Sequence, residues 1–89
     1  MNVTMKKSEE NKNFYFGTKE MVLAGGLGRV WTYDYRIEKT GKGQYRVDVM
    51  RPIVPVWESI DGGTPVRTLK DARAMINAWH ERRANGENL

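Results

Sequence analysis

The stretch RVWTYDYRIEKTGKGQYRVDV, residues 29–49, decides the fold. Apolar and polar side chains alternate on both sides of its glycine-containing middle, which is the period of a β-strand that buries one face. The middle, KTGKGQ, has the composition of a tight turn. We therefore predict an antiparallel hairpin over 30–51. The alternation places these apolar side chains on one face: Trp31, Tyr33, Tyr35, Ile37, Tyr45, Val47 and Val49.

The charged residues of the hairpin predict its register. A three-residue loop at 41–43 sets Glu38 opposite Arg46 and Arg36 opposite Asp48. Sliding the strands past each other would instead oppose two arginines and two aspartates. Opposite charges across a strand pair stabilise it by roughly 0.2–1 kcal/mol, and like charges destabilise it. The first register is therefore the predicted one.

The clearest helix pattern begins at Thr68. Thr68 followed three residues later by Asp71 is a capping start, because both side chains satisfy amides of the first turn. Arg82 and Arg83 stand where basic residues complement the helix dipole, and ANG follows them. The pattern predicts a helix over 69–83. Its apolar stripe consists of Leu69, Ala72, Met75, Ile76 and Trp79.

This apolar stripe needs a surface to pack on, and the aromatic face of the hairpin is the suitable partner. The rings could instead stack on nucleic-acid bases, but the stripe would then lack cover. We therefore predict an α+β fold, with an antiparallel sheet of three to four strands and one C-terminal helix packed on one face. The predicted core contains Trp31, Tyr33, Tyr35, Val47, Val49, Ile76 and Trp79.

The other segments give weaker patterns. Residues 14–24 are consistent with one strand or a short β-turn-β piece around Gly17, with a helix over 18–24 as the alternative. The glycines of 25–28 predict a turn or a bulge. All three prolines lie in 51–66, so we expect an edge strand there at best, around Val54–Ser59. Its apolar side chains are expected to cover the rim of the core: Ile53, Val56, Trp57 and Ile60.

Length and composition indicate one small domain. A chain of 89 residues buries about 60–65% of the surface that its unfolded form exposes, so the core is thin. The absence of cysteine excludes a disulfide framework and a thiolate nucleophile. The longest apolar stretch, 21–27, is far shorter than a membrane span. We expect a flexible lead-in at 1–13, a single α+β domain at 14–84 and a flexible tail at 85–89, in a cytoplasmic protein.

Residues suited to catalysis or metal binding are scarce. His80 is the only histidine; it follows Trp79 and is expected to point away from the apolar stripe into solvent. Ser8 and Ser59 are the only serines, and no motif joins either to His80. His80 and Glu81 together do not supply the three or four ligands of a zinc site. The glycine-rich segment leads into a strand, whereas a phosphate-binding loop leads into a helix. We predict no enzymatic activity, no cofactor and no metal.

Charge placement points instead to a binding protein. The net charge is +4, and the excess lies in 29–51 and 67–89. A basic hairpin favours polyanionic partners, and a two-stranded ribbon can enter a major groove. The arginines of the polar face are expected either to contact a partner or to pair with neighbouring acids, and the tip lysines either to reach phosphates or to remain solvated. The candidate binding residues are Arg29, Arg36, Lys39, Lys42, Arg46 and Arg51.

The order of strand, glycine turn, strand, short strand and Thr-capped helix over 30–83 resembles the small sheet-plus-helix proteins of phages and mobile elements. Within that group, YDYRIEKTGKGQYRVDV followed by VRTLKDARAMINAW is similar to the AP2-like arm-binding domains of integrases. That resemblance implies a three-stranded sheet backed by a helix, with the outer face of the sheet in the DNA major groove. Small stand-alone phage proteins of this size also resemble anti-CRISPR and other inhibitors, which occlude a partner surface.

We therefore predict a non-enzymatic accessory protein of phage or mobile-element type that binds nucleic acid or a nucleoprotein complex through a basic β-hairpin. The alternative is a protein inhibitor that docks on a host or bacterial defence complex. DNA, RNA and protein remain open as partners, and no membrane is expected.

Overall fold

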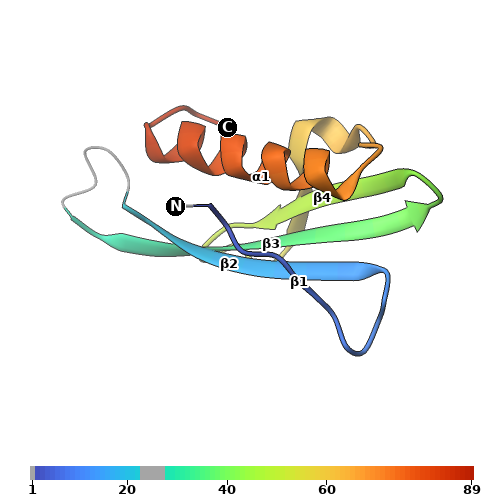
Figure 1. Cartoon of the computed structure of the whole chain (residues 1–89). Helices are drawn as coiled ribbons and strands as arrows, with labels where there is room; N and C mark the ends of the chain where they lie inside the picture. Colours follow the sequence, from blue (N-terminus) through green and yellow to red (C-terminus); the bar gives the residue numbers. More distant parts are fainter. Residues whose placement is uncertain (1, 23–27) are drawn as a thin grey trace.

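The structure, a computed structural model, describes residues 2–22 and 28–89. Within these residues the chain forms a five-stranded antiparallel sheet with an α-helix against one face (Figure 1). The strand order is β1-β2-β3-β4-β5, so each strand pairs with its neighbours in sequence. The α+β class is confirmed, and the sheet exceeds the three to four strands predicted. The elements are β1 (Lys6–Lys7), β2 (Phe14–Val22), β3 (Val30–Gly41), β4 (Gln44–Met50), β5 (Trp57–Ser59), the 3₁₀ turn η1 (Ile60–Gly63) and α1 (Leu69–Ala84).

The central hairpin, β3 and β4, has the predicted register along most of its length. Arg36 pairs with Asp48, and Glu38 pairs with Arg46. The tip differs, because Gly41 pairs with Gln44 and the register shifts between Lys39 and Gly41. The loop is thus shorter than the three residues predicted. Gly43 has a φ of 66°, which a glycine adopts without strain.

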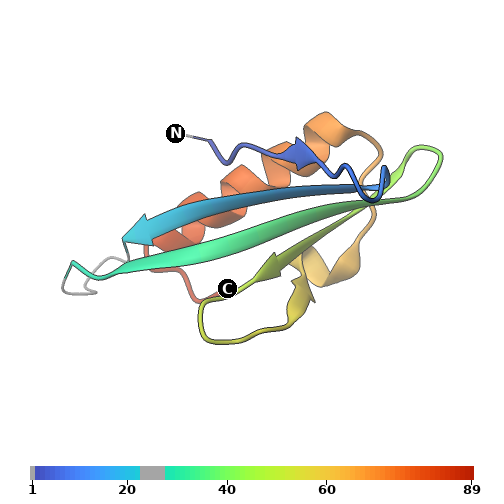
Figure 2. The same ribbon diagram turned by 90° about the horizontal axis from the view of Figure 1, so that it is seen from below.

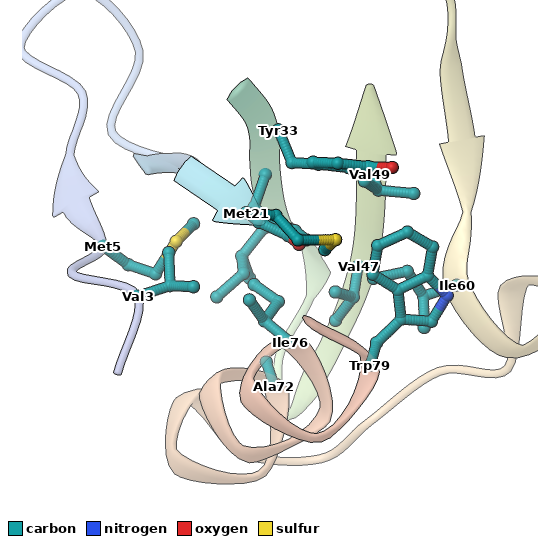
Figure 3. Packing of buried hydrophobic residues seen from close by; sticks show 12 residues of the cluster. Val3, Met5, Met21, Tyr33, Val47, Val49, Ile60, Ala72, Ile76 and Trp79 are labelled. Carbon is teal, nitrogen blue, oxygen red and sulfur yellow. The ribbon is translucent and has the colours of Figure 1, made fainter. Parts of the chain in front are cut away.

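The core lies between the sheet and α1. Figure 3 shows Ala72, Ile76 and Trp79 of α1 pointing at the strands. Six of the predicted core side chains are buried, and Trp31 is partly buried against them. The core is therefore thin, but it extends over three strands, β2, β3 and β4, and includes the segment before β1. Its buried apolar residues are Val3, Met5, Met21, Tyr33, Tyr35, Ile37, Val47, Val49, Ile60, Ala72, Ile76 and Trp79.

The helix begins as predicted. The Thr68 Oγ1 accepts a hydrogen bond from the Asp71 amide at 3.0 Å, which satisfies one of the free amides of the first turn. The helix continues to Ala84, one residue beyond the predicted end, and the Asn85 amide still donates to the Glu81 carbonyl. No helix in the described ranges is both long enough and apolar enough to cross a bilayer.

β2 is a single strand that runs through Gly17, which resolves the alternatives left open for 14–24 in favour of a strand. The segment before β1 crosses close over Gly17. A Cβ atom there would lie 2.5 Å from the Met5 Sδ and 2.6 Å from the Thr4 carbonyl oxygen. Residues 2–13, expected as a lead-in, thus contribute β1 and two core side chains, Val3 and Met5. Of the predicted glycine turn at 25–28, residues 25–27 lie outside the described residues.

The proline-rich connection departs from the predicted rim of the core. β5 occupies the end of the predicted edge strand. Ile60 is buried, but Ile53 is 84% exposed and Val56 is 54% exposed, so their predicted burial is wrong. Trp57 lies on the face of the sheet opposite α1, because it pairs with Met50, whose side chain shares that face. The prolines that begin this connection keep its backbone off the sheet ladder, and its apolar side chains therefore do not follow a strand period.

Candidate functional site

Aromatic side chains gather on the face of the sheet opposite α1, which we call the outer face. Figure 2 looks onto this face, with the strands in front of the helix, and no helix in the described part of the chain lies over it. The Phe14 and Phe16 rings stack with their centroids 5.8 Å apart, and the Phe16 and Trp57 centroids are 6.2 Å apart. Arg36 lies opposite Phe16 in the register. We call these four residues the aromatic platform: Phe14, Phe16, Arg36 and Trp57.

Arg36 is fixed at the centre of the aromatic platform. Its guanidinium carbon is 4.6 Å from the Trp57 ring centroid and 5.5 Å from the Phe14 centroid, which are cation–π distances. Its Nε and Nη2 donate to the Asp48 Oδ2 at 3.0 and 2.8 Å. Asp48 is only 2% exposed, and the Ser59 hydroxyl donates to its other oxygen at 3.4 Å. The charge of Arg36 is therefore compensated, and two of its nitrogens already have acceptors.

Arg46 also has acidic partners, as the predicted register implied. Its Nη2 donates to the Glu38 Oε1 at 2.8 Å, and its Nε lies 3.5 Å from the Asp48 Oδ2. Its side chain nevertheless keeps 43% exposure. Arg36 and Arg46 thus share Asp48, and only Arg46 has much of its surface open to a partner.

Arg51 and Arg29 lie away from the hairpin tip. The Arg51 Nε donates to Glu58 at 3.0 Å, and its guanidinium carbon is 5.3 Å from the Trp79 ring centroid. Arg51 thus contacts the edge of the core. Arg29 is exposed just before β3, at the end of that strand remote from the hairpin tip. The structure therefore does not bring the six predicted binding residues together as one surface.

Basic side chains do converge at the end of the sheet where the hairpin turns. Lys39 and Lys42 are exposed there. The Lys39 amide donates to the Asn13 carbonyl at 2.7 Å, which brings Lys12 to this end. Tyr45 of β4 forms a bridge with Val66, and this places the neighbouring Arg67 at the same end of the sheet. We call these four residues the basic end: Lys12, Lys39, Lys42 and Arg67. No carboxylate of the described residues is within ion-pair distance of any of them.

Two parts of this arrangement were not predicted. The outer face was expected to carry only charged side chains near a partner, and this is wrong because β2 and β5 add rings to it. The alternation of Phe14 and Phe16 was the available signal, but the face that they occupy depends on their pairing with β3. Lys12 and Arg67 join Lys42 through contacts between distant turns, for which a single sequence carries no signal.

His80 is buried, and its predicted exposure is wrong. It is only 6% exposed, and its Nδ1 lies 2.5 Å from the Tyr35 hydroxyl oxygen. His80 follows Ile76 by four residues, so the two share a helix face. That spacing was the missed signal, because the prediction considered only the neighbouring Trp79.

The surroundings of His80 favour the neutral form of its ring. Burial lowers the pKa of His80, and the positive charge of Lys19 lowers it further, while a backbone hydrogen bond with Glu20 acts in the opposite direction. Burial raises the pKa of the Tyr35 hydroxyl well above its usual value. A cleft of about 470 Å³ lies beside His80, lined by α1 and the end of β2. Within residues 2–22 and 28–89, no three His, Cys, Asp or Glu side chains are grouped as metal ligands.

No protein-family model matches the chain, and no curated protein or solved structure is significantly similar to it. Function is therefore inferred from the residues of this chain alone.

Proposed function

We propose that the protein binds nucleic acid, with the basic end contacting phosphates. The observation that carries the proposal is that Lys39 and Lys42 lie beside Lys12 and Arg67, and none of the four has an acidic partner within the described residues. Lysine and arginine side chains that are not neutralised within the protein release counterions when they meet phosphates, which drives association. The proposed protein is a non-enzymatic accessory protein.

The shape of the molecule supports this proposal. The protein is elongated, with extents of 43 × 24 × 24 Å, and the basic end occupies one end of the long axis (Figure 1). This end of the molecule can approach a phosphate backbone through its lysines and Arg67, while Glu9 and Glu10 lie in the same turn as Lys12. Arg36 and Arg46, paired with acids, have a structural role in this proposal. Lys39 and Lys42 contact the phosphates.

Salt dependence and a charge exchange at opposite ends of β3 test the proposal. We expect the Kd for a labelled oligonucleotide to rise steeply with added salt, and the slope to fall by about one for each phosphate contact removed. Lys42→Glu should weaken binding strongly. Arg29→Glu, which makes the same change of charge at the other end of β3, is the matched control and should weaken it little. Equal effects of the two variants would contradict a localised basic end.

A specific observation favours the inhibitor as the second candidate. The connection from β4 to β5 exposes Ile53, Val54 and Val56, and exposed apolar side chains in a row are typical of protein contacts. If no oligonucleotide binds at low salt, while the protein forms a stoichiometric complex with a purified defence component, the inhibitor replaces the nucleic-acid proposal.

A further inference from the structure

We propose that the aromatic platform stacks on the bases of an unpaired strand, so that the substrate of the basic end is single-stranded nucleic acid. This inference rests on the proposed function and names its substrate class.

The platform is a prearranged set of rings on an open surface. Phe14 and Phe16 stack with only 16° between their ring planes, and Trp57 continues the row from β5. Phe16 is 44% exposed, although nearby apolar side chains on the other face of the sheet are buried. Arg36 contacts the Phe14 and Trp57 rings and is itself held by Asp48. The rings are therefore held in position before a ligand arrives, which reduces the ordering cost of binding.

The charges around the platform suit a base and its backbone. Two carboxylates of the outer face have partners, since Glu38 accepts from Arg46 and Asp34 accepts from the Thr18 hydroxyl at 2.9 Å. Lys6 lies directly opposite Phe16 on the same face, and no carboxylate of the described residues pairs with it. Lys39 lies about 10 Å beyond Arg36 along β3, but the odd spacing places its side chain on the face toward α1. A strand whose bases lie on the platform therefore has Lys6 for its phosphates on the outer face, and the basic end lies beyond the platform.

Duplex nucleic acid does not fit this surface. In a duplex the base faces are stacked on one another and only their edges are accessible, so exposed rings find a partner face only in an unpaired strand. Reading a guanine edge requires an arginine that presents two free donors. Arg36 donates its Nε and Nη2 to Asp48, and Arg46 donates its Nη2 to Glu38. The central arginines of the outer face are thus engaged within the protein, which disfavours major-groove readout by this sheet.

The experiment measures fluorescence anisotropy with three labelled probes of equal length: oligothymidylate, an abasic strand with the same phosphates, and a duplex. We expect oligothymidylate to bind more tightly than the abasic strand and the duplex. Phe16→Leu removes the ring and keeps an apolar side chain, and it should weaken oligothymidylate binding about tenfold. Phe16→Tyr restores a ring and should bind like the original protein. The circular dichroism and urea midpoint of each variant confirm that it remains folded. An oligouridylate of the same length shows whether the sugar matters.

The outcomes separate this inference from the proposed function. If all three probes bind with similar affinity, or if Phe16→Leu binds like Phe16→Tyr, the basic end binds phosphates and the stacking inference is wrong. A duplex that binds more tightly than the single strand also overturns it. If no probe binds at low salt, the proposed function itself fails. In that case a protein partner whose binding is lost in Phe16→Leu would make the platform a protein-docking surface.

Discussion

At the scale of single residues, Asp48 holds the outer face together. Its buried carboxylate accepts two hydrogen bonds from Arg36 and lies 3.5 Å from the Arg46 Nε. Removing that negative charge leaves Arg36, whose side chain is largely buried, without a compensating partner. This costs more than losing an exposed ion pair, because the remaining charge stays desolvated.

We expect Asp48→Asn to lower the free energy of unfolding by about 2 kcal/mol. Glu38→Gln removes the more exposed partner of Arg46 and should cost less than about 1 kcal/mol. Urea denaturation of the two variants, followed by tryptophan fluorescence, provides the comparison. Equal losses of unfolding free energy in the two variants would show that the burial of Asp48 adds nothing to the strength of its ion pair.

His80 gives the protein a pH-dependent stability. The titratable or charged groups that face it are Tyr33 and Tyr35 of β3, Lys19 and Glu20 of β2 and Glu81 of α1. Because the pKa of His80 is lowered in the folded state, the unfolded chain takes up a proton first as the pH falls. The stabilisation is therefore complete above the unfolded pKa of about 6.5 and is lost as the pH falls through the folded pKa.

We expect the free energy of unfolding to decrease between pH 7.5 and pH 5.5, by at most about 1.4 kcal/mol for each pH unit. In His80→Gln this decrease should disappear, because glutamine has no proton to gain. Urea midpoints across the pH range measure both proteins. A slope that persists in His80→Gln would assign the pH dependence to other groups.

Some single-residue contacts were predictable from the sequence and others were not. The Arg36–Asp48 pair was predictable because the hairpin contains its own register information in alternating charges. The platform was not, since Phe14 and Phe16 lie on β2 and Trp57 lies on β5, and the relative position of these two strands depends on tertiary structure. The burial of His80 follows from its position four residues after the buried Ile76, on the same face of the helix.

At the scale of elements, Gly17 determines how close β1 can approach β2. A side chain at this position would overlap the Met5 sulfur and the Thr4 carbonyl oxygen. Met5 can rotate away, but the Thr4 oxygen is backbone and moves only if the whole segment shifts. A glycine in the middle of a strand therefore permits the close crossing of another backbone.

We expect Gly17→Ala to lower the free energy of unfolding by about 1–3 kcal/mol. Gly41→Ala is the control, because its Cβ would meet only the Gln44 Oε1, the end of a flexible side chain, at 3.2 Å. Hydrogen exchange adds a local measurement: the Val3 amide, which donates to the Asn77 Oδ1 at 2.8 Å, should exchange faster in Gly17→Ala. Unchanged exchange at Val3 would show that the crossing tolerates a methyl group.

Elements were predictable where a clear period runs over several residues, and β2, although nine residues long, lacks a clear period around Gly17. β3, β4 and α1 each span seven residues or more, so several consecutive positions repeat the same inside-outside pattern. β1 has two residues and β5 has three, which is too short for any period. Their places in the sheet follow from pairing with β2 and β4 rather than from their own sequences.

At the scale of the whole molecule, the sheet and α1 form two layers, and the two faces of the sheet differ. The face under α1 forms the apolar core, and no helix of the described residues covers the outer face (Figures 1 and 2). The two-layer arrangement was predictable because one apolar stripe and one apolar sheet face require each other. The location of the basic end was not, since it depends on which turns meet at one end of the sheet. The sheet has five strands, two more than the three that the resemblance implied.

The crossing at Gly17 bears on the order in which the chain becomes complete during synthesis. Val3 and Asn77 are 74 positions apart, so the ribosome makes the segment around Met5 long before the helix that shelters it. Until α1 has emerged from the ribosome, Val3 and Met5 of the nascent chain are exposed. A chaperone that recognises short apolar segments can bind them during this interval. A truncated product that lacks α1 would keep that segment permanently uncovered.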